Sequence, residues 1–91
     1  MPYYKKEVLN KICYTELVYE RINKKLHLAL SKDQIEAMVF IIIQETQESG
    51  FKKIGKNIYI TNNDSHIRLT INSATKRIIT ADRLSKTTTL S

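Results

Sequence analysis

The sequence predicts an α+β fold, in which two N-terminal helices pack on one face of a C-terminal antiparallel meander of three to four strands. Apolar residues recur at helical spacing up to about residue 46, whereas after Gly50 they alternate with polar residues at a period of two. The length of 91 residues suits one domain, which we expect over residues 1–83, followed by a flexible tail over residues 84–91.

The first helix is expected over about residues 5–28, where Lys and Glu residues separate the members of an apolar stripe. The stripe consists of Leu9, Ile12, Leu17, Ile22 and Leu26. Four of the five tyrosines, Tyr3, Tyr4, Tyr14 and Tyr19, lie in or near this segment. We assign them core or interface roles, and an aromatic first helix is one basis for a homodimer.

The second helix has a clear start at Ser31, because Gln34 follows at the capping-box spacing. Its predicted buried face consists of Ile35, Met38, Val39, Ile42, Ile43 and Thr46. Phe40 and Ile41 extend the apolar surface almost all round, which predicts a central core helix. Gly50 is the predicted C-terminal stop.

Three strands are expected at residues 57–61, 66–71 and 77–83, and a short fourth strand at residues 51–54. If residues 62–65 and 72–76 form the loops, Tyr59 faces Arg68, Arg68 faces Thr80, and His66 faces Asp82. The core face then consists of Ile58, Ile60, Ile67, Leu69, Ile71, Ile79 and Ala81. A slip of one residue would mix the two faces, so this pairing is favoured.

The predicted solvent face carries polar side chains that suit acid–base chemistry. Its members are Asn57, Tyr59, Thr61, His66, Arg68, Thr70, Thr80 and Asp82, with Ile78 the apolar exception. In the catalytic hypothesis, His66 is a general base or acid that Asp82 orients, and Arg68 stabilises developing negative charge. Tyr59 stacks on a base or positions a phosphate, and Thr80 is the fifth candidate catalytic residue. The alternative is the ordinary polar surface of an antiparallel sheet.

The net charge of +6 arises entirely in the second half of the chain. Residues 1–50 carry seven basic and seven acidic residues, whereas residues 51–91 carry eight basic and two acidic residues. Such asymmetry is typical of nucleic-acid binding, and a solvated basic surface is the alternative. The predicted contact residues are Lys52, Lys53, Lys56, Arg68, Lys76, Arg77 and Arg83.

Several classes of protein are excluded or disfavoured. A single cysteine, Cys13, cannot form an internal disulfide, which favours a reducing, cytoplasmic location. No apolar run approaches the roughly 18 residues of a membrane span, so we expect no membrane partner. Two histidines and one cysteine give no zinc spacing, and Gly50, Gly55 and Lys56 do not form a phosphate loop. We therefore expect no metal ion or cofactor.

Two resemblances add to this interpretation. Segments 12–23, 55–60, 67–73 and 77–83 resemble an uncharacterised family of short bacterial proteins, a domain of unknown function. The order of two helices and a meander, with Arg68, Thr70, Thr80 and Ala81, resembles the barnase/EndoU/colicin/RelE superfamily of metal-independent ribonucleases, which includes many toxins. That second resemblance implies an active site on the exposed sheet face, as His66, Arg68, Tyr59 and Thr80 would provide.

Three functions follow as hypotheses. The first is a small basic protein that cleaves RNA as a toxin-like, metal-independent endoribonuclease, with a cognate inhibitor as a further partner. The second is a non-catalytic inhibitor of a nucleic-acid enzyme, which docks in anti-CRISPR fashion on a protein surface or a guide RNA. The third is a homodimeric interaction module.

Overall fold

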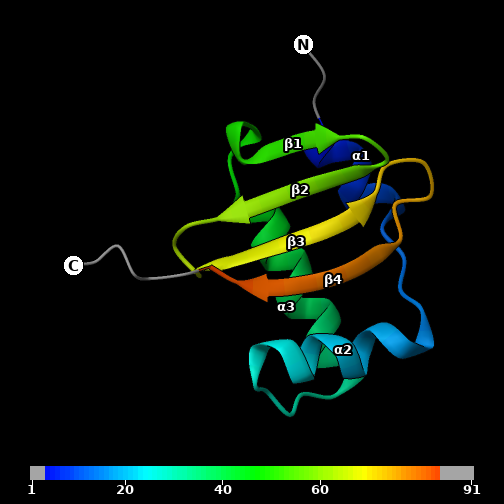
Figure 1. Ribbon diagram of the computed structural model, residues 1–91, viewed down its shortest axis with the longest axis vertical. Coiled ribbons are helices and arrows are strands. Elements are labelled where there is room, and N and C mark those ends of the chain that lie inside the picture. Colours follow the sequence, from blue (N-terminus) through cyan, green and yellow to red (C-terminus); the bar gives the residue numbers. More distant parts are fainter. Residues whose placement is uncertain (1–3, 85–91) are drawn as a thin grey trace.

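The computed structural model describes residues 4–84 and contains three helices, a short 3-10 helix and a four-stranded antiparallel sheet (Figure 1). The elements are α1 (Tyr4–Lys11), α2 (Glu16–Leu26), α3 (Lys32–Glu45), η1 (Glu48–Gly50), β1 (Phe51–Ile54), β2 (Asn57–Asn62), β3 (Ile67–Asn72) and β4 (Ile78–Arg83). The α+β class is confirmed, and the strands follow the order β1-β2-β3-β4. Apart from Leu84, the tail expected over residues 84–91 lies outside the described residues.

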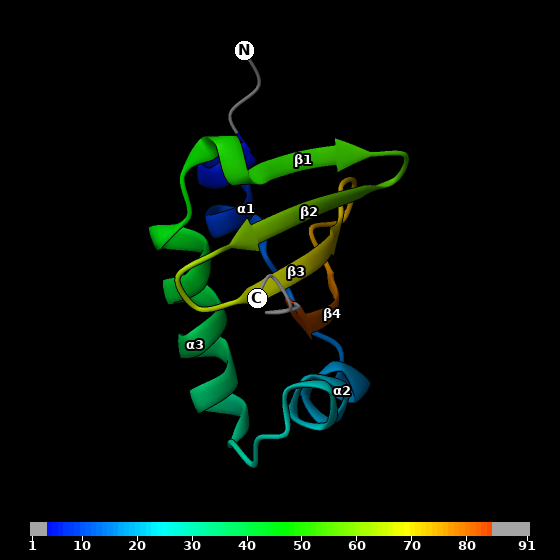
Figure 2. The ribbon, with the colours of Figure 1, turned by 60° about the vertical axis from the view of Figure 1, so that its left-hand side comes forward.

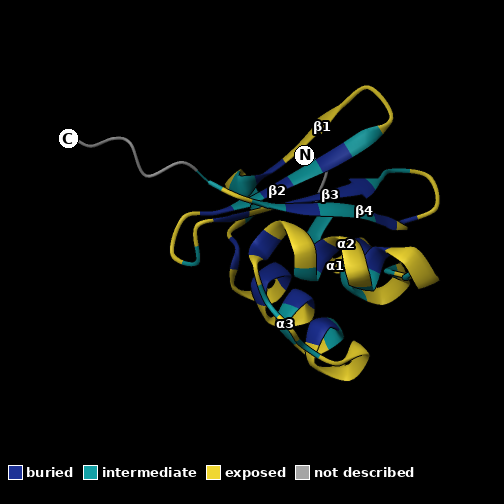
Figure 3. Ribbon diagram, turned by 60° about the horizontal axis from the view of Figure 1, so that its bottom comes forward, coloured by how far each residue is buried: buried dark blue, intermediate teal, exposed yellow. Residues whose placement is uncertain are grey.

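The core lies between the helices and the sheet. In Figure 3 the three helices lie on the same side of the sheet, where the dark blue buried residues gather. One apolar cluster joins Val8 of α1, Ile22 of α2 and Val39 of α3 to Ile60 and Leu69 of the sheet. None of the helices within residues 4–84 combines the length and the apolar character that crossing a bilayer requires.

The prediction of one helix over residues 5–28 is wrong, because residues 12–15 separate α1 from α2. The Cys13 amide donates to the Lys76 carbonyl over 3.0 Å, and the Cys13 carbonyl accepts from the Ile78 amide over 3.0 Å. These bonds form a parallel bridge between Cys13 and Arg77. Backbone groups that a continuous helix would pair internally are therefore paired with the start of β4.

The start of α3 is as predicted. The Gln34 amide donates to Ser31 Oγ over 3.2 Å, and the Ser31 amide donates to Gln34 Oε1 over 2.9 Å, which completes the capping box. The central-core prediction is wrong, because 43% of Phe40 and 51% of Ile41 is exposed. One face of α3 covers the core, while Phe40 and Ile41 point away from it.

Gly50 does not end α3 as predicted, since the helix ends at Glu45 and Thr46 is its C-cap. Gly50 belongs to η1, where a Cβ atom would lie 2.6 Å from Thr46 Cγ2 and 2.8 Å from the Thr61 carbonyl oxygen. A side chain at this position would therefore force the end of α3 and β2 apart.

The predicted division of the strands into two faces is largely confirmed, but the predicted pairing is wrong by two residues. Tyr59 pairs with Thr70, while Arg68 pairs with Thr61 and Asp82. The first turn occupies residues 63–66 rather than 62–65, which moves every β2–β3 partner by two positions and keeps each residue on its face. The β3–β4 pairs from Ile67 to Thr70 are also displaced by two positions.

A second correction concerns the start of β4. The pairing of β3 with β4 shifts between Thr70 and Ile71, where a bulge exchanges the two neighbouring isoleucines. Ile78 is 1% exposed and belongs to the core, whereas Ile79 is only half-buried. The predicted exception, Ile78 on the solvent face, is therefore wrong.

The position of the first turn depends on the buried side chain of Asn62. Asn62 Nδ2 donates to Thr46 Oγ1 over 2.9 Å and to the Ile42 carbonyl over 3.4 Å. Asn62 Oδ1 accepts from the Ser65 amide over 2.9 Å and from Ser65 Oγ over 3.1 Å. One amide thus links the end of α3 to the turn between β2 and β3.

The two inner tyrosines of the predicted first helix join α2 to α3. The rings of Tyr14 and Tyr19 stack with centroids 5.6 Å apart, and Tyr19 Oη donates to Glu36 Oε2 over 2.5 Å. The hydrogen bond to Glu36, followed by burial, raises the pKa of Tyr19 to about 12. Burial also raises the pKa of Tyr14. These rings make contacts inside the domain, and the homodimer stays a prediction.

Replacing Asn62 with Ala should lower the free energy of unfolding by about 1–3 kcal/mol, because the Ser65 amide and Thr46 lose a buried partner. Urea denaturation measures this change. The matched control is Asn63→Ala at the adjacent exposed position, which should change stability by no more than about 0.5 kcal/mol. Equal effects of the two substitutions would contradict the role assigned to Asn62.

Replacing Glu36 with Gln should lower the pKa of Tyr19 from about 12 towards the ordinary value of 10.0, because the carboxylate no longer opposes phenolate formation. Since folding raises this pKa, the contact contributes stability below pH 10 and loses it as the pH rises through 12. Ultraviolet absorbance of the phenolate follows the titration. The exposed Glu20→Gln variant is the control and should titrate as the wild type does.

Candidate nucleic-acid interface

The sheet surface opposite the core, called the open face below, is mostly polar. It consists of Lys52 and Ile54 of β1, Asn57, Tyr59 and Thr61 of β2, Arg68, Thr70 and Asn72 of β3, and Thr80 and Asp82 of β4. One row across the strands runs Lys52, Tyr59, Thr70 and Thr80, and the next runs Thr61, Arg68 and Asp82. Lys52, Ile54 and Arg68 are exposed, and Tyr59 and Thr61 are half-buried.

An arginine–tyrosine contact occupies the middle of the open face. Arg68 Cζ lies 5.7 Å from the centroid of the Tyr59 ring, a cation–π distance. Lys52 pairs with Tyr59 across the β1–β2 ladder. No carboxylate within residues 4–84 forms an ion pair with Arg68. The guanidinium is therefore held against the ring while its donors stay available to an anion.

Asp82 is engaged elsewhere, although it pairs with Arg68 in the ladder. Its Oδ1 accepts from Lys25 Nζ over 3.0 Å, so a lysine side chain of α2 neutralises this carboxylate of β4. His66 lies in the turn before β3 with a left-handed φ of 58°, and its carbonyl accepts from the Leu84 amide over 2.8 Å. The predicted pairing of His66 with Asp82 is therefore wrong. Thr80 does lie on the open face, opposite Thr70.

Two of the predicted nucleic-acid contacts have partners within the fold. Only 5% of Lys76 is exposed; its Nζ donates to the Ser73 carbonyl and lies 3.6 Å from Glu7 Oε2. Its assignment as a nucleic-acid contact is wrong, because a buried ammonium cannot reach a phosphate. Arg83 is exposed but donates from Nη2 to the Leu26 carbonyl over 2.8 Å, at the end of α2. Arg77 is exposed at the start of β4, in a groove beside Leu17.

Five of the predicted cations remain, and the four other than Arg77 are Lys52, Lys53, Lys56 and Arg68, which we call the basic cluster. All four residues are exposed. Figure 2 shows the tip of the β1–β2 hairpin on the opposite side of the molecule from α3. The Lys56 carbonyl accepts from the Ser73 amide over 2.8 Å, which ties this tip to the turn between β3 and β4.

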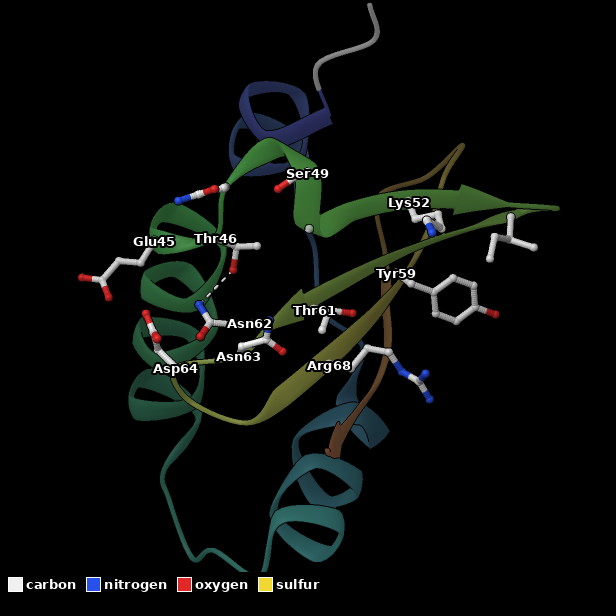
Figure 4. Close-up of a pocket in the computed structure, with 13 residues that line it drawn as sticks. Glu45, Thr46, Ser49, Lys52, Tyr59, Thr61, Asn62, Asn63, Asp64 and Arg68 are labelled. Carbon is white, nitrogen blue, oxygen red and sulfur yellow. Dashed lines mark hydrogen bonds between the residues drawn. The ribbon is translucent and has the colours of Figure 1, made fainter. Parts of the chain in front are cut away.

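A hollow of about 800 Å³ opens between the end of α3, η1 and the open face. Lys52, Tyr59 and Arg68 lie on one side of it in Figure 4, and Glu45 and Asp64 lie on the other, with Thr61 between. Glu45, Asn63 and Asp64 are not among the site residues predicted from the sequence. Residues 62–65 are all turn formers, and that pattern indicates a turn without showing what faces it.

Comparison with protein families shows where the chain belongs. A family model described as Protein of unknown function (DUF3781) matches residues 6–82. The chain belongs to this family. The match confirms the resemblance to an uncharacterised family and spans α1 to β4, so it includes the open face of this DUF3781 protein. No curated protein and no solved structure matches the chain, and the resemblance to ribonuclease toxins stays a prediction.

Proposed function

We propose that this DUF3781 protein binds single-stranded RNA on its open face. The observation that carries the proposal is the exposed Arg68 guanidinium held over the half-buried Tyr59 ring, without a carboxylate partner among the described residues. Aromatic rings and guanidinium planes stack on unpaired bases, and cations beside them contact the phosphates. A duplex hides its base faces, so this arrangement favours a single strand.

The distribution of charge supports the same partner. Lys52 lies on the open face in the row next to that of Arg68, and Lys56 lies at the tip of the β1–β2 hairpin. Lys53 is exposed on the same strand as Lys52 but pairs with Ile58, so it lies on the other side of this edge strand. Residues 1–50, a segment that includes α1, α2 and α3, carry equal numbers of basic and acidic residues. A polyanion is therefore attracted to the sheet rather than to the helices.

We propose binding rather than cleavage. General acid–base catalysis needs a proton-transfer group within hydrogen-bond reach of the reacting atoms, usually oriented by a second group. In this domain His66 lies in the turn, and Lys25 holds the carboxylate that was expected to orient it. The endoribonuclease hypothesis would therefore need a different acid–base pair.

Affinity for a short oligouridylate should fall steeply with salt. If three or four cations of the basic cluster contact phosphates, the slope of log affinity against log salt is about −2 to −3. Replacing Lys52, Lys53 and Lys56 with Gln should leave Arg68 as the only cation of the basic cluster and flatten the slope to about −0.7. Fluorescence anisotropy over a salt series measures both values.

The control for this series is Lys24→Glu on α2, an exposed lysine with no side-chain partner among residues 4–84. It should retain the wild-type affinity and slope. Undetectable or salt-independent binding by the wild type would contradict the proposal and favour the inhibitor hypothesis.

Gel analysis of the same RNA in EDTA should show intact strands. Cleavage by the wild type and not by His66→Ala would restore the endoribonuclease hypothesis.

Replacing Tyr59 with Ala should weaken binding about 5–150-fold, the cost of losing one stacked base, and should leave the salt slope unchanged. Tyr59→Phe keeps the ring and should bind nearly as the wild type does. Arg68→Lys keeps the charge but loses the planar group over the ring, so it should weaken binding at an unchanged slope. A Tyr59→Ala variant that binds normally would show that the RNA does not stack on this ring.

A further inference from the structure

The hollow beside Tyr59 has a different chemistry on each of its two sides. We infer, on the basis of the proposed function, that it accepts one base of the bound strand and prefers a base with an exocyclic amine to uracil. The amine would point towards Asp64 and Asn63. This inference concerns which base is preferred, whereas the proposed function concerns binding of any single strand.

The position of the phosphates follows from the charges. Lys52 and Arg68 line the sheet side of the hollow, and Glu45 and Asp64 line the side formed by the end of α3 and the β2–β3 turn. Carboxylates repel phosphates, so the sugar-phosphate backbone is confined to the sheet side. Only the uncharged base of a nucleotide can extend across Thr61 towards the acidic side.

The groups on the acidic side distinguish the bases. An ionised carboxylate only accepts hydrogen bonds, whereas the Asn63 amide both donates and accepts. Asn63 projects towards Thr61 in Figure 4 and makes no side-chain hydrogen bond within the described part of the chain. Cytosine and adenine present an amine donor where uracil presents the O4 acceptor, which a carboxylate repels. Guanine offers the donor of its N2 amine.

The turn that carries these groups is held in place before any ligand arrives. Asn63 and Asp64 lie between Asn62 and Ser65, and Asn62 Oδ1 accepts from both the amide and the hydroxyl of Ser65. Asn62 is itself bound to Thr46 at the end of α3. The backbone that carries Asn63 and Asp64 is therefore preorganised, which reduces the ordering cost of recognition.

The test compares two hexamers by fluorescence anisotropy, hexauridylate and the same strand with one internal cytidine. The two pyrimidines have the same size, so the comparison isolates the amine. The wild type should bind the cytidine-containing strand about 5–150-fold more tightly. Asp64→Ala should abolish this difference without weakening the binding of hexauridylate. Glu20→Gln, an exposed carboxylate of α2, is the control and should retain the difference.

The outcomes distinguish loss of the base preference from loss of RNA binding. If the wild type binds the two hexamers equally, the base preference is overturned while RNA binding stands. If the Asp64→Ala and Asn63→Ala variants both keep the full preference, the assignment to this side of the hollow is overturned. If the wild type binds neither hexamer, the proposed function fails together with the inference.

Discussion

The hydrogen bonds of the buried Asn62 amide are the constraint on which the rest of this structure depends. Asn62 is the last residue of β2 and, by strand alternation, faces the core together with Ile58 and Ile60. A buried amide without partners is costly, and its partners here are Thr46, the Ile42 carbonyl and Ser65. The turn must therefore begin after Asn62, and this sets the pairing of β2 with β3.

The open face follows from that pairing. With Thr61 opposite Arg68, the guanidinium lies diagonally across from Tyr59, at a cation–π distance of 5.7 Å from the ring centroid. The same pairing leaves His66 in the turn. The separate pairing of β3 with β4 places Asp82 in the row of Arg68, where Lys25 neutralises it. A face that the sequence suggested for acid–base chemistry thus becomes a surface with one aromatic platform and adjacent cations, which suits binding.

The net charge of the second half of the chain overstates how many of its cations are available to a polyanion. Lys76 is buried beside Glu7 and the Ser73 carbonyl, and Arg83 bonds the end of α2. Among residues 51–84, the exposed cations without a side-chain hydrogen bond or ion pair are those of the basic cluster and Arg77. The acidic side of the hollow then restricts where a polyanion can lie, so the arrangement of charges matters more than the net value.

The sequence by itself determined the α+β class, the capping box at Ser31 and the alternation that buries Ile58, Ile60 and Leu69. These features depend on residues two to four positions apart, which local patterns record. The tertiary structure decided the break at Cys13, the two-residue shift of the pairing, the bulge at Ile79 and the hollow. Each depends on a contact between distant segments, such as Cys13 with Lys76 or Asn62 with Thr46, and no local periodicity encodes such contacts.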